Sequence, residues 1–199
     1  TQDKIGQWTS QLQEAIKTGR LPGGEAAKVA GRLNFACCVH MGKEGRAFII
    51  PVYRQAHEPY RRITTLLREA LMWWCRYLQT VAPVWRPIDW APRPHRVAWT
   101  DAASGTGILA AILWDGETLW YTRMACPAEV RRQWLPREDN YIGMLELMAV
   151  LLCVASFEEE LRQSRATVYI VKYGVLGSIL RASSRAVDTN LLIGKLWLQ

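Results

Sequence analysis

The chain has 199 residues, of which 50% are hydrophobic, and a formal net charge of +7 at pH 7. This length allows one domain or two small ones with a buried core, and the absence of a run of about 18 apolar residues argues against a membrane span. Residues 1–95 hold 14 Lys/Arg against 7 Asp/Glu, whereas residues 96–199 hold 11 of each. This asymmetry indicates an acidic partner such as nucleic acid. A basic solvated surface without a dedicated partner is the alternative.

The five cysteines indicate free thiols rather than structural cross-links. Their number is odd and they form no C-x-x-C pair, which argues against a disulfide framework and a zinc site. We therefore expect an intracellular, reducing compartment, which could be the cytoplasm, the nucleus or an organelle matrix. The three histidines are scattered, and we expect packing or surface positions for them.

The first part of the chain is predicted to be helical. Apolar residues recur at helical spacing, as Ile5, Trp8, Leu12 and Ile16 do. We predict helices over residues 4–18, 25–41, 46–57 and 60–80. Pro51 falls within the third and is expected to kink or split it.

A stretch rich in proline and tryptophan follows, over residues 81–94. Its four prolines cannot continue a helix and make a stiff connector. We therefore predict three parts: a helical region over residues 1–80, a linker over 81–94 and a second domain over 95–199. A ligand for a proline-binding module is the alternative for the linker.

The second domain is predicted to mix strands and helices. Asp115-Gly116 lies between two β-rich runs and predicts a hairpin. Residues 126–140 are polar and irregular, and Asn140 and Asp188 are predicted to be helix N-caps. We predict strands over residues 97–101, 108–114, 118–124 and 167–171, and helices over about 140–157, 175–181 and from 188 onward.

Two motifs carry a family resemblance. Thr100-Asp101-Ala102-Ala103-Ser104-Gly105-Thr106-Gly107 resembles the Thr-Asp-Ala-Ser-x-x-Gly signature of the ribonuclease H domain in retroelement reverse transcriptases. Residues 141–150 resemble the helix that carries the second acid of that family. In the first half, Leu33-Asn34-Phe35-Ala36, Gly45-Arg46 and Leu71-Met72-Trp73-Trp74 are similar to the region between polymerase and ribonuclease H in tyrosine-recombinase-type and related retroelements.

The resemblance implies a fold of the α+β or α/β class: a helical region followed by a ribonuclease H-like mixed sheet with flanking helices. The sequence would lack the fifth strand of that sheet. The activity that it implies is hydrolysis of the RNA strand of an RNA–DNA hybrid, with four carboxylates holding two Mg²⁺ ions. Asp101 matches the first carboxylate and Glu146 the second. Lys172-Tyr173 stands where the family has Asp-Asn, and the fourth acid would follow the missing strand.

Lys172 makes hydrolysis improbable. No Asp or Glu lies between Glu160 and Asp188, so no shift of register supplies the third acid. An ammonium at that position competes with a metal ion. We therefore expect Asp101 and Glu146 to be vestigial, with no metal or cofactor bound and with Lys172 ion-paired to one of them. Alternatively, Asp101 caps a turn and Glu146 is a solvent-exposed helix acid.

Our functional hypothesis is an inactive, retroelement-derived, ribonuclease H-like protein. It would be a nucleic-acid-associated or structural subunit of a larger assembly, such as a ribonucleoprotein, with RNA, an RNA–DNA hybrid or protein subunits as partners. The alternative is the Mg²⁺-dependent ribonuclease H part of a reverse transcriptase, as a fragment or altered form, and a relic without a selected role is a third reading. The predicted nucleic-acid contacts are Lys43, Arg46, Arg61, Arg62, Arg68 and Arg76. These side chains could instead be a solvated helix face or bind an acidic protein.

Overall fold

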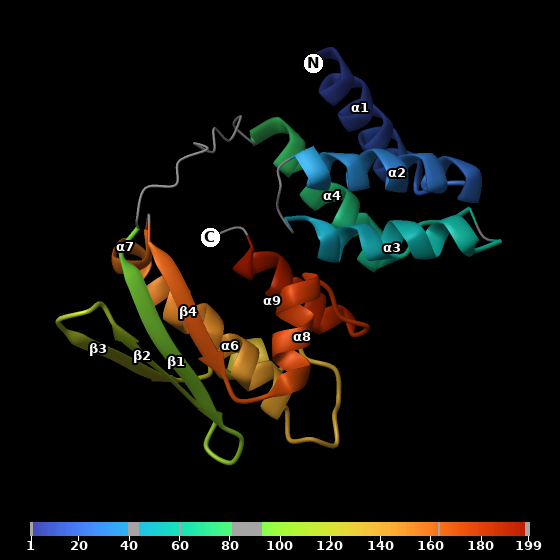
Figure 1. Ribbon diagram of the computed structural model, residues 1–199. Coiled ribbons are helices and arrows are strands. Elements are labelled where there is room, and N and C mark those ends of the chain that lie inside the picture. Colours follow the sequence, from blue (N-terminus) through green and yellow to red (C-terminus); the bar gives the residue numbers. More distant parts are fainter. Residues whose placement is uncertain (1, 40–43, 60, 81–92, 163, 198–199) are drawn as a thin grey trace. The chain divides into compact units, whose positions relative to one another are not determined.

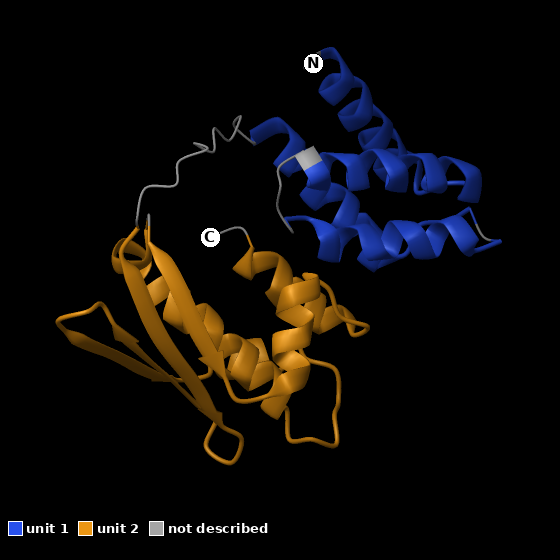
Figure 2. Cartoon of the chain, viewed as in Figure 1, with its two compact units in different colours: residues 1–87 blue, residues 88–199 orange. Residues whose placement is uncertain are grey.

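The computed structural model describes residues 2–39, 44–59, 61–80, 93–162 and 164–197. It divides into two compact units, residues 1–87 and residues 88–199 (Figure 2). Residues 81–92, which include most of the predicted linker, lie outside the described part of the chain. Each unit has its own apolar core.

Unit 1 is a bundle of helices (Figure 1). Its elements are α1 (Gln2–Thr18), α2 (Gly23–Val39), α3 (Arg46–His57) and α4 (Thr65–Thr80). The apolar stripe of each helix faces the others, so that Leu12, Leu33, Val52 and Trp74 are all buried in one core. Pro51 lies within α3, which continues past it.

The prediction of a helix from residue 60 is wrong at its start, because α4 begins at Thr65. The backbone before α4 is held by the connection between α1 and α2 instead of by helical hydrogen bonds. These bonds run from Leu21 N to Arg61 O (2.6 Å) and from Ile63 N to Gly19 O (3.0 Å). Thr64 then accepts a hydrogen bond from the backbone N–H of Leu67 through Oγ1, at 3.2 Å, and so caps the first turn of α4.

Unit 2 is built on a four-stranded sheet. Its strands are β1 (His95–Ala103), β2 (Ile108–Trp114), β3 (Leu119–Ala125) and β4 (Arg165–Ile170), in the order β3-β2-β1-β4. The first three strands form antiparallel hairpins, and β4 pairs with β1 in parallel. As predicted, the β2–β3 hairpin turns at Asp115-Gly116, where Asp115 Oδ1 accepts the N–H groups of Glu117 and Thr118.

Five helices accompany this sheet: α5 (Ala128–Arg131), α6 (Ile142–Ser156), α7 (Glu158–Leu161), α8 (Tyr173–Arg181) and α9 (Val187–Leu196). Figure 1 shows α6 across one face of the sheet, with α8 and α9 beside it. Because α6 has the sheet on one side and these helices on the other, it is apolar nearly all round. The N-cap predicted at Asn140 is wrong: Asn140 and Tyr141 both have positive φ, and α6 starts only at Ile142.

The predicted class is confirmed at the level of an α+β protein with a mixed sheet flanked by helices. None of the described helices is both long and apolar enough to cross a membrane. The five cysteines are free thiols, and only Cys38 is exposed.

Candidate functional site

Three of the predicted site residues come from three elements of unit 2 that meet at one edge of the sheet. Asp101 lies near the C-terminal end of β1, and Lys172 immediately precedes α8, just after β4. Since β1 and β4 are parallel, their C-terminal ends lie at the same edge. Glu146, in the second turn of α6, completes the group. The structure therefore brings Asp101 and Lys172 each close enough to Glu146 for their charges to act on its carboxyl.

Glu146 is the buried member of the group, with 3% of its surface exposed. Its Oε2 atom has no hydrogen-bond partner among the described residues. Burial raises the pKa of this carboxyl above its usual value, the nearby Asp101 carboxylate raises it further, and Lys172 partly lowers it. The alternative prediction of a solvent-exposed helix acid is therefore wrong.

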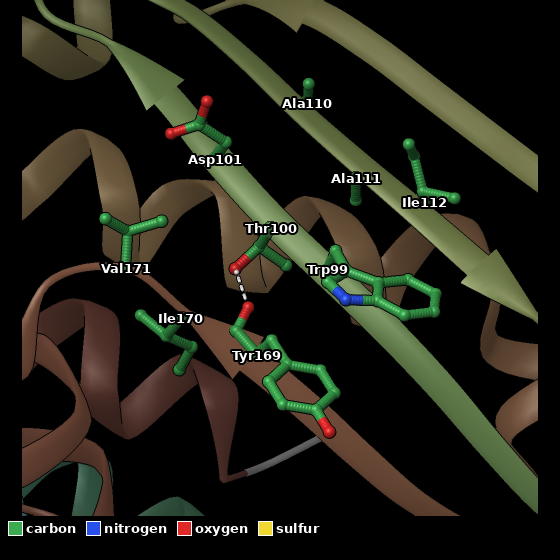
Figure 3. A pocket seen from close by; sticks show the side chains of 9 residues that line it. All are labelled: Trp99, Thr100, Asp101, Ala110, Ala111, Ile112, Tyr169, Ile170 and Val171. Carbon is green, nitrogen blue, oxygen red and sulfur yellow. Dashed lines mark hydrogen bonds between the residues drawn. The ribbon is translucent and has the colours of Figure 1, made fainter.

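Asp101 is the exposed member. Its Oδ1 atom accepts a hydrogen bond from the backbone N–H of Ala102, at 2.9 Å. The side chain borders a groove of about 310 Å³ on the face of the sheet that carries Trp99 and Tyr169 (Figure 3). The neighbouring Thr100 is buried and donates from Oγ1 to the backbone oxygen of Tyr169, at 3.3 Å, which ties β1 to β4 beside the site.

Lys172 forms its ion pair with Asp139, with 2.9 Å between Nζ and Oδ2. The prediction that it pairs with Asp101 or Glu146 is wrong. Asp139 is the better partner because it lies in the turn before α6, where the backbone N–H groups of Tyr141 and Gly143 also stabilise its charge. The hydrogen bond from Lys172, followed by its charge, lowers the pKa of Asp139.

Asp139 is a site residue that the sequence analysis missed. It falls in a polar stretch without periodicity and lies 33 positions from its partner. A Cβ added at Gly143 would lie 3.8 Å from both Asp139 Oδ2 and Lys172 Nζ, so the start of α6 lies against the pair. No signal in the sequence indicated this contact, because the fold alone brings the two segments together.

The N-cap predicted at Asp188 is also wrong. Ala186 is the N-cap of α9, and Asp188 is buried in its first turn. Its Oδ2 atom accepts the backbone N–H of Leu135 at 2.9 Å, and its Oδ1 atom lies 2.5 Å from Arg137 Nη2. This buried ion pair anchors the segment that leads to Asp139, and so contributes to the position of the Lys172 partner.

The described residues contain no group of three or more His, Cys, Asp or Glu side chains that could hold a metal ion. Asp101 and Glu146 supply two carboxylates whose charges interact, although the Asp101 side chain borders the groove on the face of the sheet that α6 leaves uncovered. Asp139 is engaged by Lys172, whose positive charge also acts on Glu146. The arrangement is a small cluster of carboxylates with a built-in counter-ion.

Five of the six predicted nucleic-acid contacts belong to the described residues, and all five are solvent-exposed, at two places in unit 1. Arg46 begins α3, next to Gly45, and Gly45 packs against Trp74 of α4. Trp74 lies in the C-terminal half of α4, which also carries Arg76, so Arg46 and Arg76 belong to the same region of unit 1. The other three predicted contacts lie before or in the first turns of α4: Arg61, Arg62 and Arg68. Lys43 lies outside the described residues.

A second basic surface of unit 1 was not predicted. A groove of about 470 Å³ between α1 and α2 is lined by Lys4, Trp8, Lys28, Gly31, Arg32 and Phe35. Phe35 is 62% exposed, and Lys28 pairs with Glu25 at 2.9 Å. The i,i+4 spacing of Lys28 and Arg32, followed three positions later by Phe35, was the signal that could have indicated this surface.

No protein-family model matches the chain, and no curated protein is significantly similar to it in sequence.

Proposed function

We propose that this chain is a ribonuclease H-like protein, derived from a retroelement reverse transcriptase, that associates with nucleic acid without hydrolysing it. The motifs at residues 100–107 and 141–150 support this reading by their resemblance to that family. Three antiparallel strands followed by a long helix and a parallel fourth strand are compatible with the fold. The protein would act as a nucleic-acid-associated or structural subunit of a larger assembly.

The observation that carries the proposal is the position of Lys172 directly after β4, where its charge acts on Glu146. Mg²⁺ requires several oxygen ligands in near-octahedral geometry, and here a fixed ammonium takes the place of a ligand. Two like charges 4 Å apart repel by about 4 kcal/mol at an effective dielectric constant of about 20. The residues present therefore do not fit a two-metal site, and Lys172 would supply the neutralising charge instead.

The basic surfaces of unit 1 support the association with nucleic acid. In the groove between α1 and α2, Lys4, Lys28 and Arg32 would neutralise phosphates. The exposed ring of Phe35 offers an apolar surface against which a base or sugar would pack. Contacts of this kind are insensitive to sequence and weaken with salt.

One observation favours the alternative, a Mg²⁺-dependent ribonuclease H part of a reverse transcriptase. Glu146 Oε2 is buried without a hydrogen-bond partner, next to a second carboxylate at Asp101. A carboxylate oxygen in that state is suited to coordinate a cation. Under this alternative, the missing oxygen ligands would come from outside the described residues.

The decisive experiment is hydrolysis of a labelled RNA–DNA hybrid in the presence of Mg²⁺ or Mn²⁺. We expect no cleavage by the wild-type chain. Cleavage that disappears in an Asp101→Ala variant would contradict the proposal and favour the enzyme. In parallel, calorimetric titration with Mg²⁺ should detect no binding to the wild type but measurable binding to a Lys172→Asp variant.

The nucleic-acid association is tested separately, by fluorescence anisotropy with labelled single-stranded RNA, RNA–DNA hybrid and duplex DNA. We expect binding that is similar across sequences and falls as the salt concentration rises. No binding to any of the three at moderate salt would leave only the role of a protein subunit.

A further inference from the structure

The face of the sheet that α6 leaves uncovered carries large apolar side chains from all four strands. Register partners point to the same side of a sheet, so one row across the strands consists of Tyr121, Ile112, Trp99 and Tyr169. The rings of Trp99 and Tyr169 stack with centroids 5.8 Å apart and planes 12° apart (Figure 3). Trp114, Leu119 and Val171 continue this patch, which we call the outer face.

The strands beneath the outer face have the composition of strands that are covered on both sides. The whole of β2, Ile108–Trp114, is apolar, with Leu109, Ala111 and Leu113 turned to the core. Strands that are buried on both faces are near-continuous apolar runs, as β2 is here. Among the described residues of unit 2, no helix covers the outer face (Figure 1).

The size of the outer face matches that of a stable interface. Tyr121 is 82% exposed and Val171 is 73% exposed, and five further large apolar side chains each expose more than a third of their surface. With full areas of about 150–250 Å² for the aromatic residues, the exposed apolar area is on the order of 800 Å². A standard protein–protein interface buries about 800 Å² on each partner.

The charges on the outer face are complementary to those of a second copy. In the row next to the aromatic one, Arg123 lies on the edge strand β3, and Asp101 lies two strands away on β1, beyond Ala110. Both are exposed, and neither forms an ion pair in the described parts of the chain. A two-fold axis parallel to the strands would place β3 of each copy over β4 of the other.

We propose that the outer face binds the outer face of a second copy of this chain, with the two-fold axis along the strands. Tyr121 of each copy packs into the groove beside Trp99 and Tyr169 of the other, and Arg123 of each reaches Asp101 of the other. Sheets that pack face to face lie about 10 Å apart, and their strand directions differ by about 30° or less. An arginine side chain that reaches toward an aspartate on the facing sheet spans this separation. This inference goes beyond the proposed function and does not depend on it.

A single-stranded nucleic acid is the other occupant to be considered, because it also stacks on exposed aromatic rings. The carboxylate of Asp101 borders the groove and would repel phosphates, and Ile112 and Val171 are aliphatic. A second copy suits both the carboxylate and the aliphatic side chains, because it covers the aliphatic side chains and supplies a cation for Asp101. The face therefore fits a protein surface better than a nucleic-acid strand.

The test is sedimentation velocity of the full chain, free of nucleic acid, over a wide range of protein concentration. We expect a reversible monomer–dimer equilibrium. Arg123→Glu and Asp101→Lys should each raise the dimer Kd by about tenfold or more, because a close charge pair across the interface is replaced by repulsion. The double variant, in which the charges are exchanged, should restore a Kd near that of the wild type.

Arg132→Glu and Glu117→Lys are matched controls, because they make the same charge changes at exposed positions of unit 2 off the outer face. Circular dichroism melting should show all six proteins folded. A monomer at every concentration would overturn the proposal. A dimer whose Kd is unchanged by both single substitutions would overturn it as well. So would a monomer that binds single-stranded RNA and loses this binding on Trp99→Ala, because the outer face would then be a nucleic-acid-binding surface.

Discussion

Lys172 and Asp139 form an ion pair of 2.9 Å between Nζ and Oδ2, although 33 positions separate them in the chain. The pair joins the end of β4 to the turn before α6. It places the Lys172 ammonium near enough to the buried Glu146 for its charge to act on that carboxyl. The cation of the candidate site is thus supplied by the chain itself.

Replacing Lys172 by methionine should change the titration of two carboxyls. The pKa of Asp139 should rise toward its usual value, because its main stabilising partner is gone, and that of Glu146 should rise further. Stability should change by less than about 1 kcal/mol, because both members of the pair are more than a third exposed. Carboxyl NMR titration checks the first point and thermal melting the second.

The control for this substitution is Arg162→Met, which breaks the exposed ion pair with Glu158. It should leave the titration of Asp139 and Glu146 unchanged. Equal shifts of Glu146 in both variants would mean that Lys172 does not act on it directly.

Glu146→Gln should stabilise the protein at neutral pH. A carboxyl whose pKa is raised by folding favours the folded state at low pH, and this contribution is lost as the pH rises from the usual value of 4.5 through the folded pKa. The variant cannot ionise, so it should be more stable than the wild type at neutral pH, by on the order of 1 kcal/mol. The stabilities of the variant and the wild type should converge below the usual carboxyl pKa of 4.5.

Urea unfolding across the pH range measures this difference. Glu129→Gln, at an exposed position of α5, should keep the wild-type pH dependence. If the free energy of unfolding of the wild type did not fall below that of Glu146→Gln as the pH rose above 4.5, Glu146 would not be a buried carboxyl with a raised pKa.

Arg137→Met should destabilise unit 2 strongly. Asp188 is 6% exposed, and the substitution leaves its buried charge with the N–H groups of Leu135 and Thr189 but without its cation. Removing one member of a buried pair costs about 3 kcal/mol or more. Lys28→Met, which breaks the exposed pair with Glu25, should cost less than about 1 kcal/mol. Similar losses for the two variants in urea unfolding would argue against a structural role of Asp188.

Gly45→Ala should destabilise unit 1. Gly45 has φ of +76°, and an added Cβ would lie 2.5 Å from the ring of Trp74, which is fully buried. We expect a loss of about 3 kcal/mol from backbone strain and overpacking. Gly6→Ala in α1 is the matched comparison: no atom lies within 4 Å of its added Cβ, so it should stabilise the protein by about 0.5–1 kcal/mol. Thermal melting of both variants checks the contrast.

Phe35→Ala should weaken nucleic-acid binding by about tenfold, because stacking contributes about 1–3 kcal/mol per base. Arg32→Gln should weaken it for all sequences alike and reduce the slope of log K against log salt by about 1. Lys17→Gln, at the opposite end of α1 from Lys4, removes the same charge away from the groove and should have little effect. Anisotropy at several salt concentrations measures all three. A larger effect of Arg46→Gln and Arg76→Gln would move the contact to the other basic surface.

The local elements of both units were largely predictable, because they depend on patterns within short windows. The apolar period of residues 4–18 predicted α1, and the continuous run of residues 108–114 predicted β2. The errors fell where distant backbone decides a boundary. Residues 61–63 pair with the segment around Gly19 instead of starting α4, and Asn140 has a left-handed conformation instead of capping α6.

The sequence by itself determined which chemistry the site lacks: an ammonium at position 172 cannot act as an oxygen ligand, whatever the fold. It also determined the excess positive charge of the first half. Only the tertiary structure decided the partners. Burial of Glu146, the pairing of Lys172 with Asp139 and of Asp188 with Arg137, and the apolar row across four strands all join segments far apart in the chain. Such contacts depend on packing between elements, which no local pattern of residues encodes.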